Sequence, residues 1–178
     1  MKKNEKNFNK MILFFDFILV IAGIALDQWS KAFMTRLLKG NPAVPIIKDV
    51  LELTYVENRG AAFGILQGKR IYFIILAAVI LFLFVWLLLK LPPEKKYRKI
   101  HMALSLILAG AMGNTIDRWR NGYVVDFIYF KLIDFPVFNV ADIYITVTTI
   151  WLAVLILFFY KEEDFAFLQR KRGTKDSQ

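Results

Sequence analysis

The chain has 178 residues, of which 57% are hydrophobic, and it carries a formal net charge of +9. A soluble domain of this size cannot bury so much apolar surface, so the composition indicates a multi-pass membrane protein with a single domain over residues 1–178. The absence of cysteine excludes disulfides and thiolate metal sites, and one histidine cannot build a zinc site. We expect no metal and no cofactor. The positive charge predicts contact with anionic membrane phospholipid rather than with nucleic acid.

Four apolar segments predict a membrane all-α fold, a four-transmembrane-helix bundle, because hydrocarbon offers the backbone no hydrogen-bond partner outside a helix. They cover about residues 11–33, 71–89, 100–119 and 141–160. The first resembles a secretory signal peptide in its basic start and apolar middle, but the internal Asp16 and the three later spans favour a membrane helix. Asp16 lies about 16 Å inward of Asp27 by helix rise, and we assign it, with His101, to the inner interface.

A small β insert is predicted at about residues 40–66, between the first two spans. The stretch VLELTYVEN alternates apolar and polar residues from Leu51 to Tyr55, as a half-buried strand does, and Asn58 to Gly60 supply a turn. We expect this insert to lie on the outer membrane surface. The tail, residues 161–178, is charged and is expected on the inner side.

Lysine and arginine set the orientation. The three short segments on one side carry 4, 5 and 5 of them: residues 1–10, 90–99 and 161–178. The two longer segments on the other side carry 7 and 3: residues 27–70 and 117–140. The denser side is predicted to be cytoplasmic, with both termini inside. Four aspartates then converge toward the outer face: Asp27, Asp117, Asp126 and Asp142.

Asp126 and Asp142 are the candidate catalytic residues. Each has a purely structural interpretation as well. Asn139 and Asp142 have the spacing of a capping box at a helix N-terminus, and Asp126, between VV and FI, could simply face water in a loop. Together, however, two carboxylates at membrane depth are costly and usually functional.

A close pair of carboxylates cannot carry two full charges, so one member holds a proton. That arrangement supplies an acid and a base at neutral pH, which water-mediated peptide hydrolysis needs. We assign the base to Asp142, because the positive end of its helix stabilises the charge, and the acid to Asp126. The assignment is a hypothesis, since coupled carboxylates titrate as a pair.

Further polar residues mark the outer helix ends. Asn114, Asp117 and Arg118 fall on one helix face, and Asp27 pairs with Lys31 at i,i+4. Helix capping and an ordinary ion pair would explain both groups. A Ser30–Lys31 catalytic dyad is disfavoured, because adjacent residues point in different directions on a helix.

These motifs, taken in order, resemble those of the lipoprotein signal peptidases, the type II signal peptidases of bacteria. The matching stretches are DQWSK at 27–31, NRGAAFG at 58–64, GAMGNTIDR at 110–118, VVDF at 124–127 and FNVAD at 138–142. The resemblance covers roughly residues 15–160. Ala111 stands where the family has a second packing glycine.

The resemblance implies an aspartyl endopeptidase without metal or organic cofactor, with Asp126 and Asp142 as its catalytic pair. It implies a substrate, the signal peptide of a prolipoprotein whose lipobox cysteine carries diacylglycerol, and a β-cradle between the first two helices. The resemblance also implies supporting residues around this pair, to which we add neighbours from the same motifs. Together these residues are Asp27, Lys31, Asn58, Gly60, Asn114, Asp117, Arg118 and Asn139. We expect a monomer in the bacterial cytoplasmic membrane, with its site toward the extracytoplasmic face.

Two other classes fit the same residues. The first is a small proton-coupled transporter or channel whose outer carboxylates relay protons, with Asp16 as the inward candidate. The second is a membrane scaffold whose acids only cap helices. Cleavage of a lipidated precursor would indicate a peptidase rather than a transporter or a scaffold.

Overall fold

The computed structural model describes residues 2–60 and 70–168. Three predicted features extend beyond these residues: the second half of the NRGAAFG motif, the end of the β insert and the end of the charged tail.

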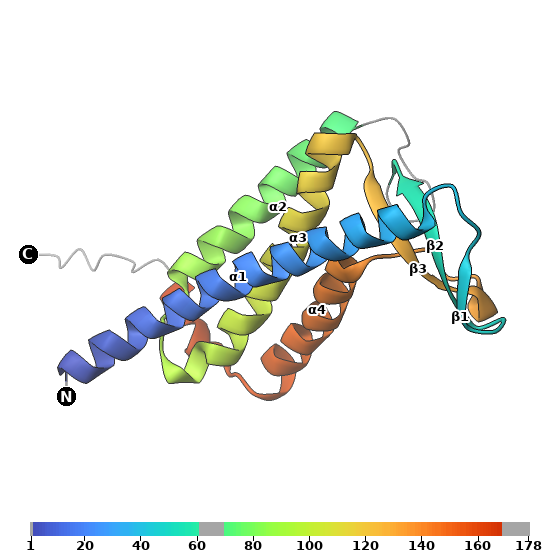
Figure 1. Ribbon diagram of the computed structural model, residues 1–178. Coiled ribbons are helices and arrows are strands. Elements are labelled where there is room, and N and C mark those ends of the chain that lie inside the picture. The colour runs from blue at the N-terminus through green and yellow to red at the C-terminus, as the bar shows by residue number, and fades with distance from the viewer. Residues whose placement is uncertain (1, 61–69, 169–178) are drawn as a thin grey trace, which may run out of the picture.

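Four long helices form the body of the molecule (Figure 1). They are α1 (Lys2–Leu38), α2 (Arg70–Lys90), α3 (Arg98–Asn121) and α4 (Val140–Phe158). Helix α3 contacts each of the other three and is the most buried, whereas α1 and α4 leave large apolar side chains exposed. An apolar exterior on a helix is the expected surface toward lipid.

Three helices among the described residues are long and apolar enough to cross a membrane: Phe8–Leu38, Lys95–Asn121 and Val140–Phe158. In α2 the stretch Ile75–Lys90 counts as a shorter apolar helix. The protein is therefore a multi-pass membrane protein of mostly helical structure, and a count of four spans stays a prediction.

Glycines on α3 let its neighbours approach closely. A Cβ added to Gly110 would lie 2.6 Å from the backbone oxygen of Ala141 in α4, and one added to Gly113 would overlap Asp27 Oδ2 in α1. On α1, a Cβ added to Gly23 would lie 2.8 Å from the Cβ of Ala109. In lipid, the hydrophobic effect does not drive helices together, so their association depends on close packing, which small residues allow. These glycines therefore set the helix spacing.

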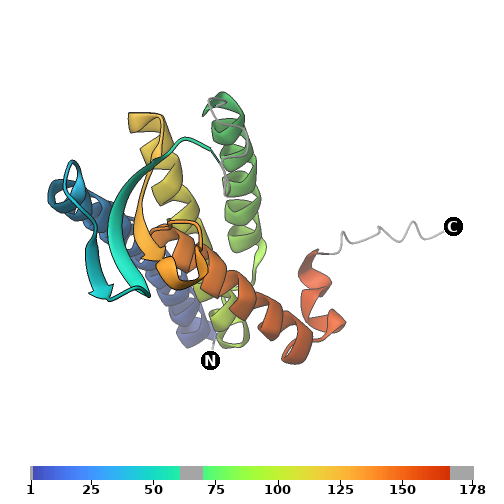
Figure 2. The same ribbon diagram turned by 90° about the vertical axis from the view of Figure 1, so that its right-hand side faces the viewer.

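An antiparallel sheet of three strands, in the order β1-β2-β3, sits at the end where α1 finishes and α4 begins (Figures 1 and 2). Its strands are β1 (Val44–Ile47), β2 (Leu51–Asn58) and β3 (Val124–Phe130), and the short helix η3 (Lys131–Ile133) follows the last one. The predicted strand in the insert is confirmed as β2.

The sequence interpretation of Asp126 as a loop residue was wrong. Asp126 lies in β3, which pairs with β2 so that Val56 lies opposite Asp126 and Asn58 opposite Val124. The sheet therefore is not confined to the segment between the first two helices. Since residues two apart share a face, Asn58 and Asp126 are diagonal neighbours on one face of the sheet.

The opposite end of the bundle closes with aromatic packing. Short helices η2 (Lys95–Tyr97) and η4 (Glu162–Leu168) meet there, and the rings of Tyr97 and Tyr160 stack at 6.1 Å. Nearby, His101 Nδ1 lies 2.6 Å from Asp16 Oδ2, and both side chains are buried. Each of these two side chains is buried against the other, and their position at the inner membrane interface stays a prediction.

Replacing Gly110 with alanine should destabilise the protein by about 1–3 kcal/mol, because the new methyl group meets backbone that cannot rotate away. The check is the midpoint of thermal unfolding in detergent, which should fall. Alanine has the higher helix propensity, so an unchanged or raised midpoint would show that α3 and α4 separate freely at this contact.

Candidate active site

A cavity of about 860 Å³ lies between the sheet and the start of α4, and both Asp126 and Asp142 line it. Asn58 and Arg118 line the same polar end. The rest of the wall is largely apolar and comes from the end of β3, the β3–α4 connection and α4: Phe130, Ile133, Phe135, Phe138, Ile143 and Val147. One cavity thus presents two carboxylates beside an apolar wall.

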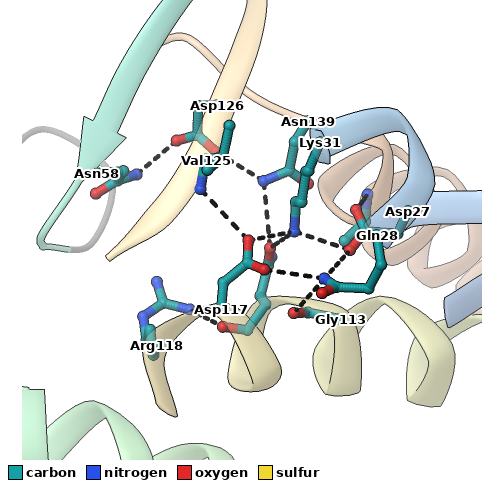
Figure 3. Close-up of polar contacts among 12 residues, drawn as sticks. Asp27, Gln28, Lys31, Asn58, Gly113, Asp117, Arg118, Val125, Asp126 and Asn139 are labelled. Carbon is teal, nitrogen blue, oxygen red and sulfur yellow. Dashed lines mark hydrogen bonds and ion pairs between the residues drawn. The ribbon is translucent and has the colours of Figure 1, made fainter. Parts of the chain in front are cut away.

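The fold of β3 aims Asp126 into this cavity. Its neighbours Val125 and Phe127 pack against the end of α1, so the alternation of a strand turns Asp126 to the other side. Only 2% of Asp126 is exposed. One of its oxygens accepts a hydrogen bond from Asn58 Nδ2 at 2.8 Å, and the other accepts one from Asn139 Nδ2 at 2.6 Å (Figure 3).

Burial raises the pKa of Asp126 from 3.8 to about 6, because a charge loses its hydration there. The hydrogen bonds from Asn58 and Asn139 oppose this rise, and the nearby charge of Asp142 adds to it. Asp126 consequently keeps its proton up to a higher pH than an ordinary aspartate does.

Asp142 is placed by the first turn of α4. Asn139 Oδ1 accepts a hydrogen bond from the Asp142 amide at 3.1 Å, and the Asn139 amide donates to Asp142 Oδ2 at 3.1 Å, which confirms the predicted capping box. The other oxygen of Asp142 accepts from Asn114 Nδ2 at 2.8 Å. Because Asn139 also bonds Asp126, one asparagine links both candidate catalytic residues.

Behind the two carboxylates lies a buried cation. Lys31 Nζ lies 2.8 Å from Asp27 Oδ2, 3.0 Å from Asp117 Oδ2 and 2.9 Å from Asn114 Oδ1. All four side chains are buried. Figure 3 shows Lys31 between Asp27 of α1 and Asp117 of α3, so the ion pairs join these two helices.

Arg118 and Gly60 close the network on the side of β2. The guanidinium of Arg118 donates to the backbone oxygens of Gly60 and Asn114, each at 3.4 Å, and the Gly60 amide donates to Asn58 Oδ1 at 3.1 Å. The turn after β2 is thereby tied to α3.

All ten residues proposed from the sequence lie in one connected network of hydrogen bonds and ion pairs. They are Asp27, Lys31, Asn58, Gly60, Asn114, Asp117, Arg118, Asp126, Asn139 and Asp142. Their chemical roles stay a prediction.

Sequence reasoning gave no role to Gln28. Its Nε2 lies 2.9 Å from Asp117 Oδ1 and 3.2 Å from Asp27 Oδ2, so it forms a second link between the same two aspartates. Membership of the DQWSK motif was the one available signal. Ser30 donates to the Asp27 backbone oxygen at 2.7 Å, which occupies its hydroxyl and argues against a Ser30–Lys31 dyad.

Within residues 2–60 and 70–168, no group of three or more histidine, aspartate or glutamate side chains is arranged to hold a metal ion. The chemistry available at this site from described residues is that of carboxyl groups, amides, one ammonium and the two guanidinium groups of Arg59 and Arg118.

Comparison with known proteins gives a consistent match. The family model described as signal peptidase (SPase) II matches residues 19–158. A lipoprotein signal peptidase of Caldanaerobacter subterraneus is 46% identical over 142 residues, covering 79% of this chain and 94% of that protein. The lipoprotein signal peptidase of Clostridioides difficile is 42% identical over 146 residues, covering 80% of this chain and 94% of that protein.

Solved structures agree with the sequence comparisons. A bacterial membrane enzyme determined at 2.3 Å resolution has a TM-score of 0.72 and 31% identity, over 90% of this chain and 94% of its own. A second, at 1.9 Å, has a TM-score of 0.69 and 33% identity, over 82% of this chain and 94% of its own.

Replacing Asn58 with alanine should raise the apparent pKa of Asp126 by about one, because the variant loses a charge-assisted hydrogen bond to the ionised carboxyl. Infrared titration of the carboxyl band, identified by its loss in Asp126→Asn, measures this. Asn41→Ala, which removes an exposed asparagine bonded to a helix carbonyl, is the control and should change nothing. A lowered pKa in the Asn58 variant would contradict the geometry.

Proposed function

The chain belongs to the signal peptidase II family, and from that premise we propose that it removes signal peptides from lipid-modified prolipoproteins as an aspartic endopeptidase. The family makes the protein a peptidase, a hydrolase of peptide bonds. The aspartic mechanism, the lipidated substrate and the outer membrane face belong to the proposal. The observation that supports it best is the shared cavity of Asp126 and Asp142, joined through Asn139.

In the first step, Asp142 takes a proton from a water molecule as the water oxygen attacks the scissile carbonyl carbon. Asp126, protonated, gives its proton to the carbonyl oxygen, so a neutral tetrahedral diol forms. The environments support this division of roles: burial favours a proton on Asp126, whereas Asp142 lies at a helix N-terminus and accepts hydrogen bonds from Asn114 and Asn139.

In the second step, the diol collapses and the carbon–nitrogen bond breaks. The proton held by Asp142 goes to the leaving amine of the lipid-modified residue, and a diol hydroxyl returns its proton to Asp126. Both carboxyl groups end as they began, so no cofactor is consumed. The signal peptide leaves with a new carboxyl terminus.

The apolar wall supports a substrate that stays anchored in lipid. Ile143 and Val147 line the cavity and are also exposed on α4, and Ile150 and Val154 continue this exposed stripe along the helix at i,i+3 and i,i+4 spacing. Acyl chains can follow that stripe while the peptide enters the polar end. Each buried methylene strengthens attachment by about 0.8 kcal/mol, so the lipid supplies much of the affinity.

The charge distribution supports a site on the outer face. The short segments, residues 1–10, 90–99 and 161–178, carry the denser positive charge and would be cytoplasmic. The sheet lies at the other end of α1 (Figure 1), and residues of β2 and β3 line the cavity. A monomer can perform this chemistry, since both carboxylates come from one chain.

The buried Asp16–His101 pair favours the alternative of a proton-coupled transporter, because it adds an ionisable group at the other end of the bundle. Proton flux in liposomes without cleavage of a lipidated precursor would establish transport in place of hydrolysis.

Asp126→Asn and Asp142→Asn should each reduce kcat for a lipidated precursor peptide by about 10²–10⁴-fold, because each removes one proton-transfer group. Purified protein in detergent and mass spectrometry of the products provide the measurement, with thermal unfolding to verify the fold. The matched control is Asp134→Asn, an exposed aspartate in the β3–α4 connection, which should cleave normally. Full activity of either site variant would exclude Asp126 and Asp142 as the catalytic pair.

The value of kcat/KM should fall as pH rises through about 6, because the free enzyme then loses the Asp126 proton that the first step donates. Rates on both sides of this pH, with enzyme stability verified at each, test the direction. A rate that instead rises through the same range would make Asp126 the base.

A further inference from the structure

We propose that Lys31 is a positioning residue that sets the separation of Asp126 and Asp142, an inference that rests on the function proposed above. Lys31 touches neither carboxylate in the described hydrogen bonds and ion pairs. It acts through the backbone that carries them and through one asparagine, as the contacts of its three donors show.

Two of the three N–H donors of Lys31 point to carboxylates that also accept hydrogen bonds from backbone amides. Asp27 Oδ2 accepts a hydrogen bond from Lys31 Nζ, and Asp27 Oδ1 accepts one from the backbone amide of Ala141 at 3.0 Å. Asp117 Oδ2 lies 3.0 Å from Lys31 Nζ and also accepts the backbone amide of Val125 at 3.4 Å.

The two anchored amides occupy equivalent places in the sequence. Ala141 immediately precedes Asp142, and Val125 immediately precedes Asp126. One ammonium group therefore joins, through two carboxylates, the start of α4 to the start of β3. Any change in the distance between Asp27 and Asp117 is transmitted directly to the backbone of both candidate catalytic residues.

The third donor of Lys31 fixes a side chain. Asn114 Oδ1 accepts from Lys31 Nζ at 2.9 Å and from Asn139 Nδ2 at 3.2 Å. With its oxygen held by two donors, Asn114 must turn its NH₂ group to Asp142. All three ammonium donors are thus used, and Lys31 is only 3% exposed, so water does not compete for them.

A simpler role for Lys31 would be to neutralise two buried carboxylates. The two roles separate in charge-matched variants. Lys31→Met combined with Asp27→Asn removes one positive and one negative charge, yet the amide side chain introduced on α1 keeps an oxygen that can accept the Ala141 amide. The net charge and both backbone anchors are retained. The variant loses the ammonium bridge together with its hydrogen bond to Asn114, while Gln28 still contacts Asp117. Lys31→Met with Asp117→Asn is the second such variant and tests the β3 side.

The closing experiment measures kcat and KM for a lipidated precursor peptide in detergent, beside the thermal unfolding midpoint. We expect a folded double variant whose kcat falls about 100-fold with KM little changed, because a displacement on the order of 1 Å is enough for such a loss. The control applies the same design to a surface bridge, Lys131→Met with Glu52→Gln, where Lys131 contacts Glu52 and Asp49. That variant should keep parental rates.

A second readout does not depend on cleavage. In the parent, Asp142→Asn should lower the apparent pKa of Asp126, because it removes a nearby negative charge. In the charge-matched variants this effect of Asp142→Asn should shrink, because the two groups are no longer held together. Infrared titration of the Asp126 band gives both values.

Parental kcat and undiminished coupling in the double variants would overturn the proposal and leave Lys31 as a neutralising charge. Failure of both double variants to fold would also overturn it, by making Lys31 a requirement of the fold. If the parent itself cleaves no precursor, the proposed function fails, and the titration still decides the role of Lys31.

Discussion

The structure depends on one constraint at one end of the helix bundle. Each buried polar group there needs a fixed hydrogen-bond partner, because little water can take the place of that partner. Three asparagine amides meet this need in the same way. Asn58, Asn114 and Asn139 each donate from NH₂ to a candidate catalytic carboxylate, and the side-chain oxygen of each accepts from a second donor. An amide held at both ends cannot flip, so the carboxylates face donors of settled identity.

The cavity combines a polar and an apolar environment, and a lipid-anchored peptide likewise combines a polar backbone with apolar acyl chains. Its polar end lies among Asp126, Asp142 and Arg118, and its apolar wall continues onto the exposed face of α4. Burial raises the pKa of Asp126 at the polar end, where Asp142 and Arg118 stay partly exposed. In the proposed function, this burial supplies the acidity for hydrolysis, and the exposed apolar face of α4 supplies the surface along which the lipid-anchored substrate is held.

Local features of this fold were predictable from sequence, whereas long-range pairings were not. The capping box of Asn139 and Asp142 and the strand at Leu51–Asn58 depend on spacings of a few residues. Strand β3 was missed, although VVDFIYF is rich in β-branched and aromatic residues, because its aspartate was taken as the mark of a loop. No periodicity could reveal that Gln28 bridges Asp27 and Asp117, since that contact exists only after two helices pack.

The pairing of β2 with β3 also has a consequence for biosynthesis. Val56 lies opposite Asp126, which the ribosome makes 70 residues later (126 minus 56). At roughly 5–20 residues per second, β2 waits about 4–14 s with one edge unpaired. Helices α2 and α3 are made in that interval, so the sheet is assembled late, and the proposed catalytic pair is complete only when the start of α4 has been made.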